Sequence, residues 1–127
     1  MGIKGIGVDI VDIARFEQQL AKAPGLLDRL FAPDELAGEA NLKPATLAGK
    51  FAAKEAFIKA MGSSHGLGWH EIRVVKDSFG KPFFEVSGQS AELAAERGIS
   101  RWHLSIAHDG SMAIAYAIAE SEGGAHA

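Results

Sequence analysis

The amino-acid sequence predicts an α+β fold in which a mostly antiparallel β-sheet wraps on a long central helix. The helix is indicated by a run of good helix formers at 51–61, followed by Gly62, which suits a left-handed cap. Two stretches, at 3–11 and 112–119, alternate with the two-residue period of β-strands. Four alanines form one face of the second stretch, and we expect the central helix to pack tightly across them.

Composition indicates a single domain and excludes several classes of protein. With 127 residues, 47% of them hydrophobic, the chain can bury one core. We expect a domain at 1–120 and a disordered tail at 121–127. The absence of cysteine excludes disulfides, zinc–thiolate sites and a cysteine nucleophile. A net charge of −3 argues against general nucleic-acid binding, which needs a basic surface. No apolar stretch approaches membrane-spanning length, so we expect a cytoplasmic protein that does not enter a membrane.

Charged residues occupy unusual positions on the central helix, which we expect to begin at Pro44 or Thr46. Helical spacing places bulky apolar residues on one face and glycine and alanine on the opposite face, which predicts a buried helix. Glu55 and Lys59 lie four residues apart in the stripe between these faces, so their side chains are neighbours. They form either a simple ion pair or a site where a carboxylate binds metal and an ammonium binds phosphate. Lys54 points toward the bulky face.

The strand at 3–11 has two faces of different character. We expect its apolar face, with Ile6, Val8 and Ile10, to meet a core. The opposite face carries two glycines and Asp9, and glycines beside an acid at a strand end make room for a bulky ligand. Taken alone, Asp9 could equally mark the end of the strand or pair with a lysine.

Caps, breakers and alternation predict the remaining elements. Asp12 is expected to cap a helix that carries Arg15 and ends before the Ala-Pro-Gly break at 23–25. A short helix is predicted at 33–40, because proline suits its first position. Beyond the central helix we expect a loop at 63–68, hairpin strands at 72–76 and 83–86, a helix at 90–97, and a strand at 102–107 followed by a turn at 108–111.

The residues able to carry chemistry favour a magnesium site. The sequence holds no Gly-x-Ser-x-Gly elbow, no Walker motif and no zinc spacing among its five histidines. Asp9 and Glu55 remain as a carboxylate pair, and proteins usually hold magnesium with one or two carboxylates together with substrate phosphates. With Lys59 nearby, the two acids describe a site for magnesium and a diphosphate. His108, beside an Asp-Gly turn, is either a binding residue or an ordinary surface histidine.

Five groups of residues occur in a distinctive order along the chain. They are GIGVDIV at 5–11 with RFE at 15–17, RLFAPDEL at 29–36, FAAKEAF at 51–57 with KAMG at 59–62, GKP at 80–82, and LSIAH at 104–108. Together they resemble the holo-[acyl-carrier-protein] synthase family, the small bacterial 4′-phosphopantetheinyl transferases. The similarity extends from residue 3 to about residue 119.

This resemblance implies the 4′-phosphopantetheinyl transferase fold, a reaction and its participants. The family transfers 4′-phosphopantetheine from coenzyme A to a serine of apo-acyl carrier protein and releases adenosine 3′,5′-bisphosphate, in fatty acid biosynthesis. Mg²⁺ is the implied cofactor, coenzyme A is the substrate, and acyl carrier protein is the partner. The implied assembly is a homotrimer whose active sites lie between subunits.

By position, the resemblance also implies roles for individual residues. Asp9 and Glu55 match the magnesium ligands, and with Lys59 they are the expected catalytic residues. Glu55, directly or through a bound water, is our candidate general base for the carrier serine. Arg15 matches a basic position that meets the acidic carrier protein. The residues expected at coenzyme A are Lys50, Lys59, Gly62, Lys81, Pro82 and His108, the last from the neighbouring subunit.

Two departures from the family pattern concern coenzyme A. Lys50 stands where the family commonly has arginine, which keeps the charge but loses a planar fork for phosphate. Ala107 stands where many members have serine or threonine, so one hydroxyl contact is missing.

Two other functions stay open. A magnesium-dependent coenzyme A or nucleotide pyrophosphohydrolase would act without carrier protein, and a non-catalytic coenzyme A or carrier-protein binding module would not respond to magnesium.

Overall fold

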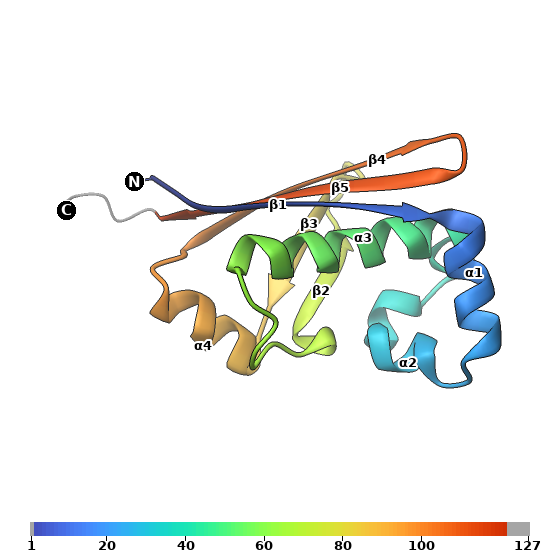
Figure 1. The fold of residues 1–127 in the computed structure, drawn as a ribbon, viewed down its shortest axis with the longest axis horizontal. Coiled ribbons are helices and arrows are strands. Elements are labelled where there is room, and N and C mark those ends of the chain that lie inside the picture. The colour runs from blue at the N-terminus through green and yellow to red at the C-terminus, as the bar shows by residue number, and fades with distance from the viewer. Residues whose placement is uncertain (1, 122–127) are drawn as a thin grey trace.

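The computed structural model describes residues 2–121 and has the expected α+β architecture (Figure 1). The strands are β1 (Gly2–Asp12), β2 (Ile72–Lys76), β3 (Pro82–Val86), β4 (Arg101–Asp109) and β5 (Met112–Ser121). The α-helices are α1 (Ile13–Lys22), α2 (Leu26–Leu30), α3 (Pro44–Met61) and α4 (Gly88–Glu96). Three short 3₁₀ helices are η1 (Pro33–Leu36), η2 (Glu39–Leu42) and η3 (Trp69–Glu71). The central helix therefore begins at the proline and ends before the glycine that the sequence indicated.

The strand pairs in the described part of the chain are antiparallel, but they form two sheets instead of one. β1, β5 and β4 make a three-stranded sheet in that order, and β2 pairs with β3. In Figure 1 the three-stranded sheet runs along one side of α3, and α2 and α4 lie on the other side. This arrangement confirms a mostly antiparallel sheet on a long central helix.

The sheet and α3 approach each other so closely that only small residues fit between them. The alanines of β5 that face the helix are completely buried. A Cβ added to Gly5 would lie 2.0 Å from the carbonyl oxygen of Ala60, and one added to Gly7 would lie 1.9 Å from that of Ala56. Since both distances are far below van der Waals contact, these glycines are required where β1 crosses α3.

The prediction for the two faces of β1 is wrong. Ile6, Val8 and Ile10 were expected to face a core, yet they lie on the outer side of the sheet, and 62% of Ile6 is exposed. The glycine face meets α3 instead, because only a strand without side chains there can come so near a helix. The space beside the two glycines is therefore occupied by the protein's own helix.

Aromatic contacts fix the other elements against the bulky side of α3. The ring of Phe51 stacks on that of Phe16 in α1, with centroids 4.7 Å apart. Phe57 stacks on Trp102 of β4 at 3.9 Å and meets Phe84 of β3 edge-on at 5.2 Å. These contacts set the position of α1 and of the β2–β3 hairpin, which both contribute residues to the pockets described below.

Several boundaries differ from the expectation. The helix expected at 33–40 is two 3₁₀ helices, η1 and η2, and α2 was not predicted. β4 continues through His108 and Asp109, so the turn is confined to 110–111. Ser121, expected in the tail, ends β5, and the rest of that expected tail, 122–127, lies outside the described residues. No helix within residues 2–121 has both the length and the apolar character needed to cross a membrane.

Candidate active site

Asp9, Glu55 and Arg15 line one cleft of about 300 Å³, although they come from three different elements. Asp9 lies near the end of β1, Arg15 in the first turn of α1, and Glu55 on α3. The turn between β1 and α1 is fixed by Asp12, whose side-chain Oδ1 accepts the backbone N–H of Arg15 at 2.9 Å. The predicted helix cap thus places the basic residue beside the two acids.

Lys59 reaches from α3 to β1. Its Nζ lies 3.1 Å from Asp9 Oδ1 and also donates to the carbonyl oxygen of Val8 at 3.1 Å. The expected neighbour was Glu55, one helical turn earlier, but the ion pair found here joins the two elements that carry the acids. Half of the Lys59 side chain stays exposed, so its ammonium can still meet an anion.

Burial of Glu55 raises the pKa of its carboxyl above the ordinary value, and the nearby negative charge of Asp9 raises it further. The positive charge of Lys59 opposes these effects in part. Two carboxylates that repel each other in one cleft suit a divalent cation, which would remove the repulsion. The described residues hold no group of three or more His, Cys, Asp or Glu that could bind a metal. Two carboxylates alone suit magnesium, which keeps several waters and binds substrate phosphates.

The raised pKa of Glu55 predicts how the stability of the protein depends on pH. Between the ordinary and the raised pKa, the folded state holds more protons on this carboxyl than the unfolded state, so stability falls as pH rises through that range. Without metal, Glu55→Gln should therefore melt a few degrees above the wild type at pH 7.5, and the gain should vanish near pH 4. Thermal unfolding, monitored by circular dichroism at the two pH values, measures the melting temperatures of both proteins. A variant less stable than the wild type at pH 7.5 would contradict the raised pKa of Glu55.

A second pocket, of about 180 Å³, contains three of the residues expected at coenzyme A. Lys50, Pro82 and His108 line it, together with Lys76 and other residues. The His108 ring nitrogen Nε2 lies 2.9 Å from the carbonyl oxygen of Ala45, at the start of α3. The ring therefore crosses from β4 onto the central helix, and it closes one side of this pocket.

Lys50 is less available than the sequence suggested. Its side chain is buried, and its Nζ donates to the carbonyl oxygen of Glu35 at 2.7 Å and to Oδ1 of Asn41 at 3.3 Å. Burial lowers the pKa of this ammonium; Glu35 opposes the effect and the nearby Lys76 adds to it. Lys76, to which sequence reasoning gave no role, is a second cation in the lining of the same pocket.

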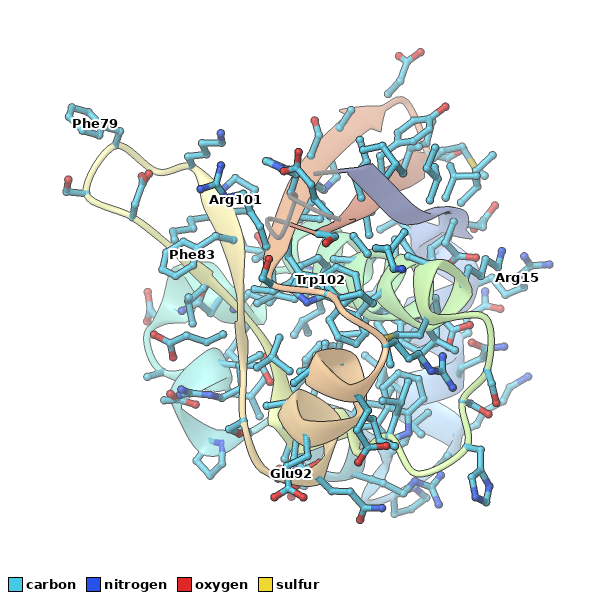
Figure 2. All side chains as sticks on the ribbon, turned by 90° about the vertical axis from the view of Figure 1, so that its left-hand side faces the viewer. Arg15, Phe79, Phe83, Glu92, Arg101 and Trp102 are labelled. Atoms are coloured by element: carbon cyan, nitrogen blue, oxygen red, sulfur yellow. The ribbon has the colours of Figure 1, made fainter. Side chains whose placement is uncertain are left out.

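Two further expected residues lie outside the lining of both pockets. Lys81 belongs to the turn between β2 and β3, where its backbone N–H donates to Asp77 Oδ1 at 2.9 Å. Figure 2 shows this hairpin extending away from the rest of the molecule, with Phe79 at its tip. Gly62 ends α3 with a φ of 88° and a backbone N–H bonded to the carbonyl oxygen of Ile58. Neither residue approaches the two acids in this single chain.

The two pockets lie on different sides of α3. Glu55 follows Lys50 by five residues, which turns the helix by about 140°. The linings of the two pockets share no residue. One chain therefore brings together Asp9, Glu55, Lys59 and Arg15 at one place, and Lys50, Pro82 and His108 at another.

Sequence reasoning missed a buried acid, Glu35. Its carboxylate pairs with Lys54 inside the protein, and neither side chain is exposed. A weak signal was present, because Glu35 lies at the third position of a short helix that begins with Pro33, where a glutamate can reach back to the preceding backbone. The sequence placed Lys54 toward the bulky face of the helix but did not show that Glu35 is its partner.

Comparison with known proteins identifies the family of proteins to which this chain belongs. A family model of the 4′-phosphopantetheinyl transferase superfamily matches residues 5–117. The chain belongs to this superfamily, and the expected fold is thereby confirmed.

Its relatives narrow the class further. The chain is 49% identical over 121 residues to holo-[acyl-carrier-protein] synthase of Clavibacter sepedonicus, covering 95% of this chain and 98% of that protein. The solved holo-[acyl-carrier-protein] synthase of Neisseria meningitidis superimposes with a TM-score of 0.85 at 35% identity, covering 94% and 99% of the two chains. The Helicobacter pylori synthase in complex with coenzyme A gives 0.80 at 31% identity, covering 91% and 99%.

Proposed function

We infer that this chain transfers the 4′-phosphopantetheine group of coenzyme A to a serine hydroxyl of apo-acyl carrier protein, with release of adenosine 3′,5′-bisphosphate. The observation that carries this inference is a cleft lined by Asp9, Glu55 and Arg15, in which Asp9 forms an ion pair with Lys59. Similarity to holo-[acyl-carrier-protein] synthases over nearly the full length of the chain supports it. We assign the reaction to one domain at 1–120, to the cytoplasm and to fatty acid biosynthesis.

The site residues divide the chemistry among them. Asp9 and Glu55 would hold Mg²⁺, which when bound neutralises negative charge on the diphosphate of coenzyme A. Lys59 places an ammonium beside the same end of the substrate, where charge builds on the leaving bisphosphate. Glu55, directly or through a bound water, accepts the proton that the carrier serine loses as its oxygen attacks the β-phosphorus. The P–O bond to the bisphosphate breaks as the new bond to serine forms.

Intact-protein mass spectrometry tests the reaction directly. Apo-acyl carrier protein is incubated with this protein, coenzyme A and magnesium, and EDTA is added to a parallel sample. A gain of one phosphopantetheine that is lost with EDTA supports both the transfer and the metal requirement. Release of bisphosphate without any gain by the carrier would instead indicate a pyrophosphohydrolase, and no change in either would leave a binding module.

We also propose that the chain forms a homotrimer with composite active sites. The outer face of the three-stranded sheet exposes apolar residues, among them Ile6, Ile10 and Tyr116. An exposed apolar face of this kind marks an interaction surface, and a second copy would cover it. The number three comes from the family resemblance. Association also accounts for the two separate pockets, since the coenzyme A residues of one copy could complete the acid cleft of its neighbour.

Composite sites predict recovery of activity by mixing two inactive proteins. Asp9→Ala and His108→Ala each disable one half of the site, so each should be nearly inactive alone. Random assembly of the two gives intact composite sites in about a quarter of positions, so co-expression should restore about that fraction of wild-type activity. Activity of co-purified mixed oligomers measures this. A mixture no more active than the mean of its parents would contradict a shared site.

The role of Arg15 predicts a salt-dependent effect. Arg15→Ala should weaken binding of the acidic carrier protein about tenfold at low salt and much less at high salt, because screening removes long-range attraction. Surface plasmon resonance at two ionic strengths measures both values. Arg29→Ala, on α2 and outside the lining of the acid cleft, is the matched control. Equal losses at both ionic strengths would show that Arg15 has a structural role instead.

A further inference from the structure

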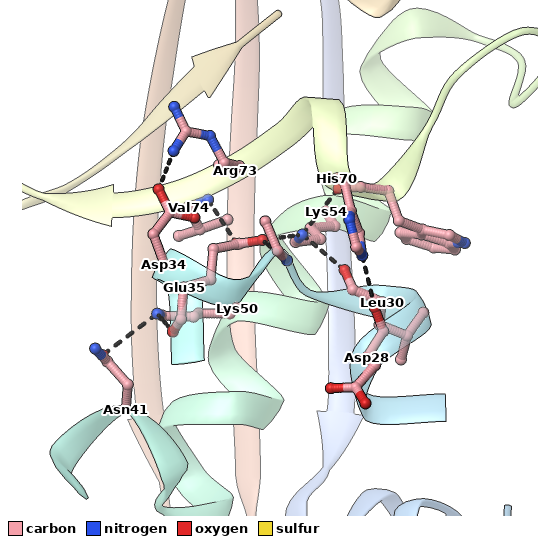
Figure 3. A network of polar contacts seen from close by, with 12 residues as sticks. Asp28, Leu30, Asp34, Glu35, Asn41, Lys50, Lys54, His70, Arg73 and Val74 are labelled. Atoms are coloured by element: carbon pink, nitrogen blue, oxygen red, sulfur yellow. Dashed lines mark hydrogen bonds and ion pairs between the residues drawn. The ribbon is translucent and has the colours of Figure 1, made fainter. Parts of the chain in front are cut away.

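A buried ion pair joins the active-site helix α3 to the short helix η1 (Figure 3). Lys54 Nζ on α3 lies 2.7 Å from Glu35 Oε1 on η1, and both side chains are fully buried. The ammonium also donates to the carbonyl oxygens of Leu30 at 2.8 Å and Trp69 at 2.9 Å. All three of its N–H groups therefore have acceptors, and these acceptors come from segments before and after α3 in the sequence.

The carboxylate of Glu35 is equally well satisfied. Its Oε1 also accepts the backbone N–H of Ala32, and its Oε2 accepts that of Val74 in β2, both at 2.9 Å. The carbonyl oxygen of the same residue accepts the ammonium of Lys50 at 2.7 Å. Glu35 thus binds two lysines of α3 that are one helical turn apart, one through its side chain and one through its backbone.

These two lysines lie on the part of α3 that separates the two pockets. Lys50 lines the pocket expected to take coenzyme A, and Glu55, adjacent to Lys54 in the sequence, lines the acid cleft. Lys54 is about 40° around the helix from Lys50 and about 100° from Glu55. A connection at Lys54 therefore restrains the rotation of the helix on which both pockets depend.

Stability alone does not explain a buried ion pair. Desolvation of two charges offsets most of their attraction, and well-packed apolar residues of similar size often stabilise a protein as well or better. Much of the contact between α3 and the sheet consists of alanine and glycine, whose side chains form no directional bonds. The hydrogen bonds of Lys54 and Glu35 to separate segments therefore add a directional restraint to the packing that holds the helix.

We propose that Glu35 and Lys54 are positioning residues of the transferase, which set the rotation of α3 so that Glu55 faces Asp9 while Lys50 stays in the second pocket. The proposal rests on the transferase function inferred above. It assigns the pair no contact with substrate. The effect of the pair is transmitted through the backbone of α3 to Lys50 and Glu55.

The test replaces the pair by apolar residues of similar size. The double variant Glu35→Leu/Lys54→Met should unfold cooperatively and keep the wild-type oligomeric state, at a lower Tm because four backbone groups lose their hydrogen-bond partners. Its kcat should fall about tenfold, because displacements of about 1 Å in an active site are costly. The magnesium concentration for half-maximal activity should rise severalfold. Calorimetry of coenzyme A binding in the presence of magnesium, which needs no turnover, should show an affinity reduced to a similar extent.

A matched control comes from the neighbouring residue. Asp34 lies on the same short helix, and its ion pair with Arg73 is at the surface. Asp34→Ala should leave kcat, magnesium dependence and coenzyme A affinity within twofold of the wild type. A folded double variant with all three quantities equally unchanged would overturn the proposal and leave the pair a purely structural element.

Two further outcomes are also decisive. Where the double variant does not fold, Glu35→Gln replaces it, since the amide keeps the shape of the side chain while it removes the charge opposite Lys54 and one of the two oxygens that accept the backbone N–H groups of Ala32 and Val74. A lower kcat and a higher magnesium concentration for half-maximal activity in this variant support the proposal, and wild-type values overturn it. Absence of transfer by the wild type itself would refute the proposed function, whereas active wild type with unaffected variants refutes only the positioning role.

Discussion

Asp9→Asn is expected to lower the rate of phosphopantetheine transfer by about 10²–10³-fold, the usual cost of losing one group that stabilises charge in a transition state. The amide keeps the size of the side chain but removes the negative charge that Asp9 contributes next to Glu55. It also weakens the ion pair that holds Lys59 at 3.1 Å. Cation binding and the placement of the ammonium are therefore disturbed together.

Steady-state kinetics with the mass-spectrometric assay measures this loss over a range of magnesium concentrations. Asp12→Asn is the matched control, because Asp12 lines the same cleft and asparagine caps a helix as well as aspartate does. The control removes the same charge from the same cleft and should stay within a few-fold of the wild type. Similar losses in the two variants would mean that the cleft needs only a general negative potential, and that Asp9 has no specific role.

Gly7→Ala is expected to unfold the protein or to reduce its free energy of unfolding by about 3 kcal/mol or more, at the upper end of what overpacking costs. The added methyl would lie 1.9 Å from the carbonyl oxygen of Ala56 and 2.8 Å from the backbone nitrogen of Ala60. Both are backbone atoms of α3, so no side chain can move aside. Such a loss is a large part of the total stability of a domain of this size.

Urea-induced unfolding measures the change. Gly2→Ala is the control, because it adds the same methyl to the same strand at a place with no atom within 4 Å. The control should unfold at nearly the wild-type urea concentration. A Gly7→Ala protein as stable as this control would show that β1 can move away from α3, contrary to the close packing described here.

The sequence was sufficient to predict most of the fold, because each element carried a local signal. Pro44 and Gly62 marked the ends of α3, Asp12 marked the start of α1, and the four alanines of β5 predicted a helix across the sheet. The orientation of β1 could not be predicted in the same way. Apolar residues normally face a core, but here a glycine face packs on the helix and the apolar face is left exposed.

The acids of the candidate site were predictable and their surroundings were not. Asp9 and Glu55 stood out because each was a charge in an otherwise small or apolar segment. The link from Lys59 to Asp9 spans fifty residues, and that from Lys54 to Glu35 spans nineteen. No local pattern specifies a partner so far away, so only the folded chain shows which lysine meets which acid.

The contact between β1 and α3 also has an entropic consequence for catalysis. Glycine and alanine have no side-chain rotamers to lose, so burying them carries no side-chain entropy cost and leaves few side-chain motions in the contact. Asp9 and Glu55 extend from the two backbones that meet there. The backbones that carry these two carboxylates are therefore already ordered in the folded protein, and binding of the substrate has no further entropy cost for ordering them.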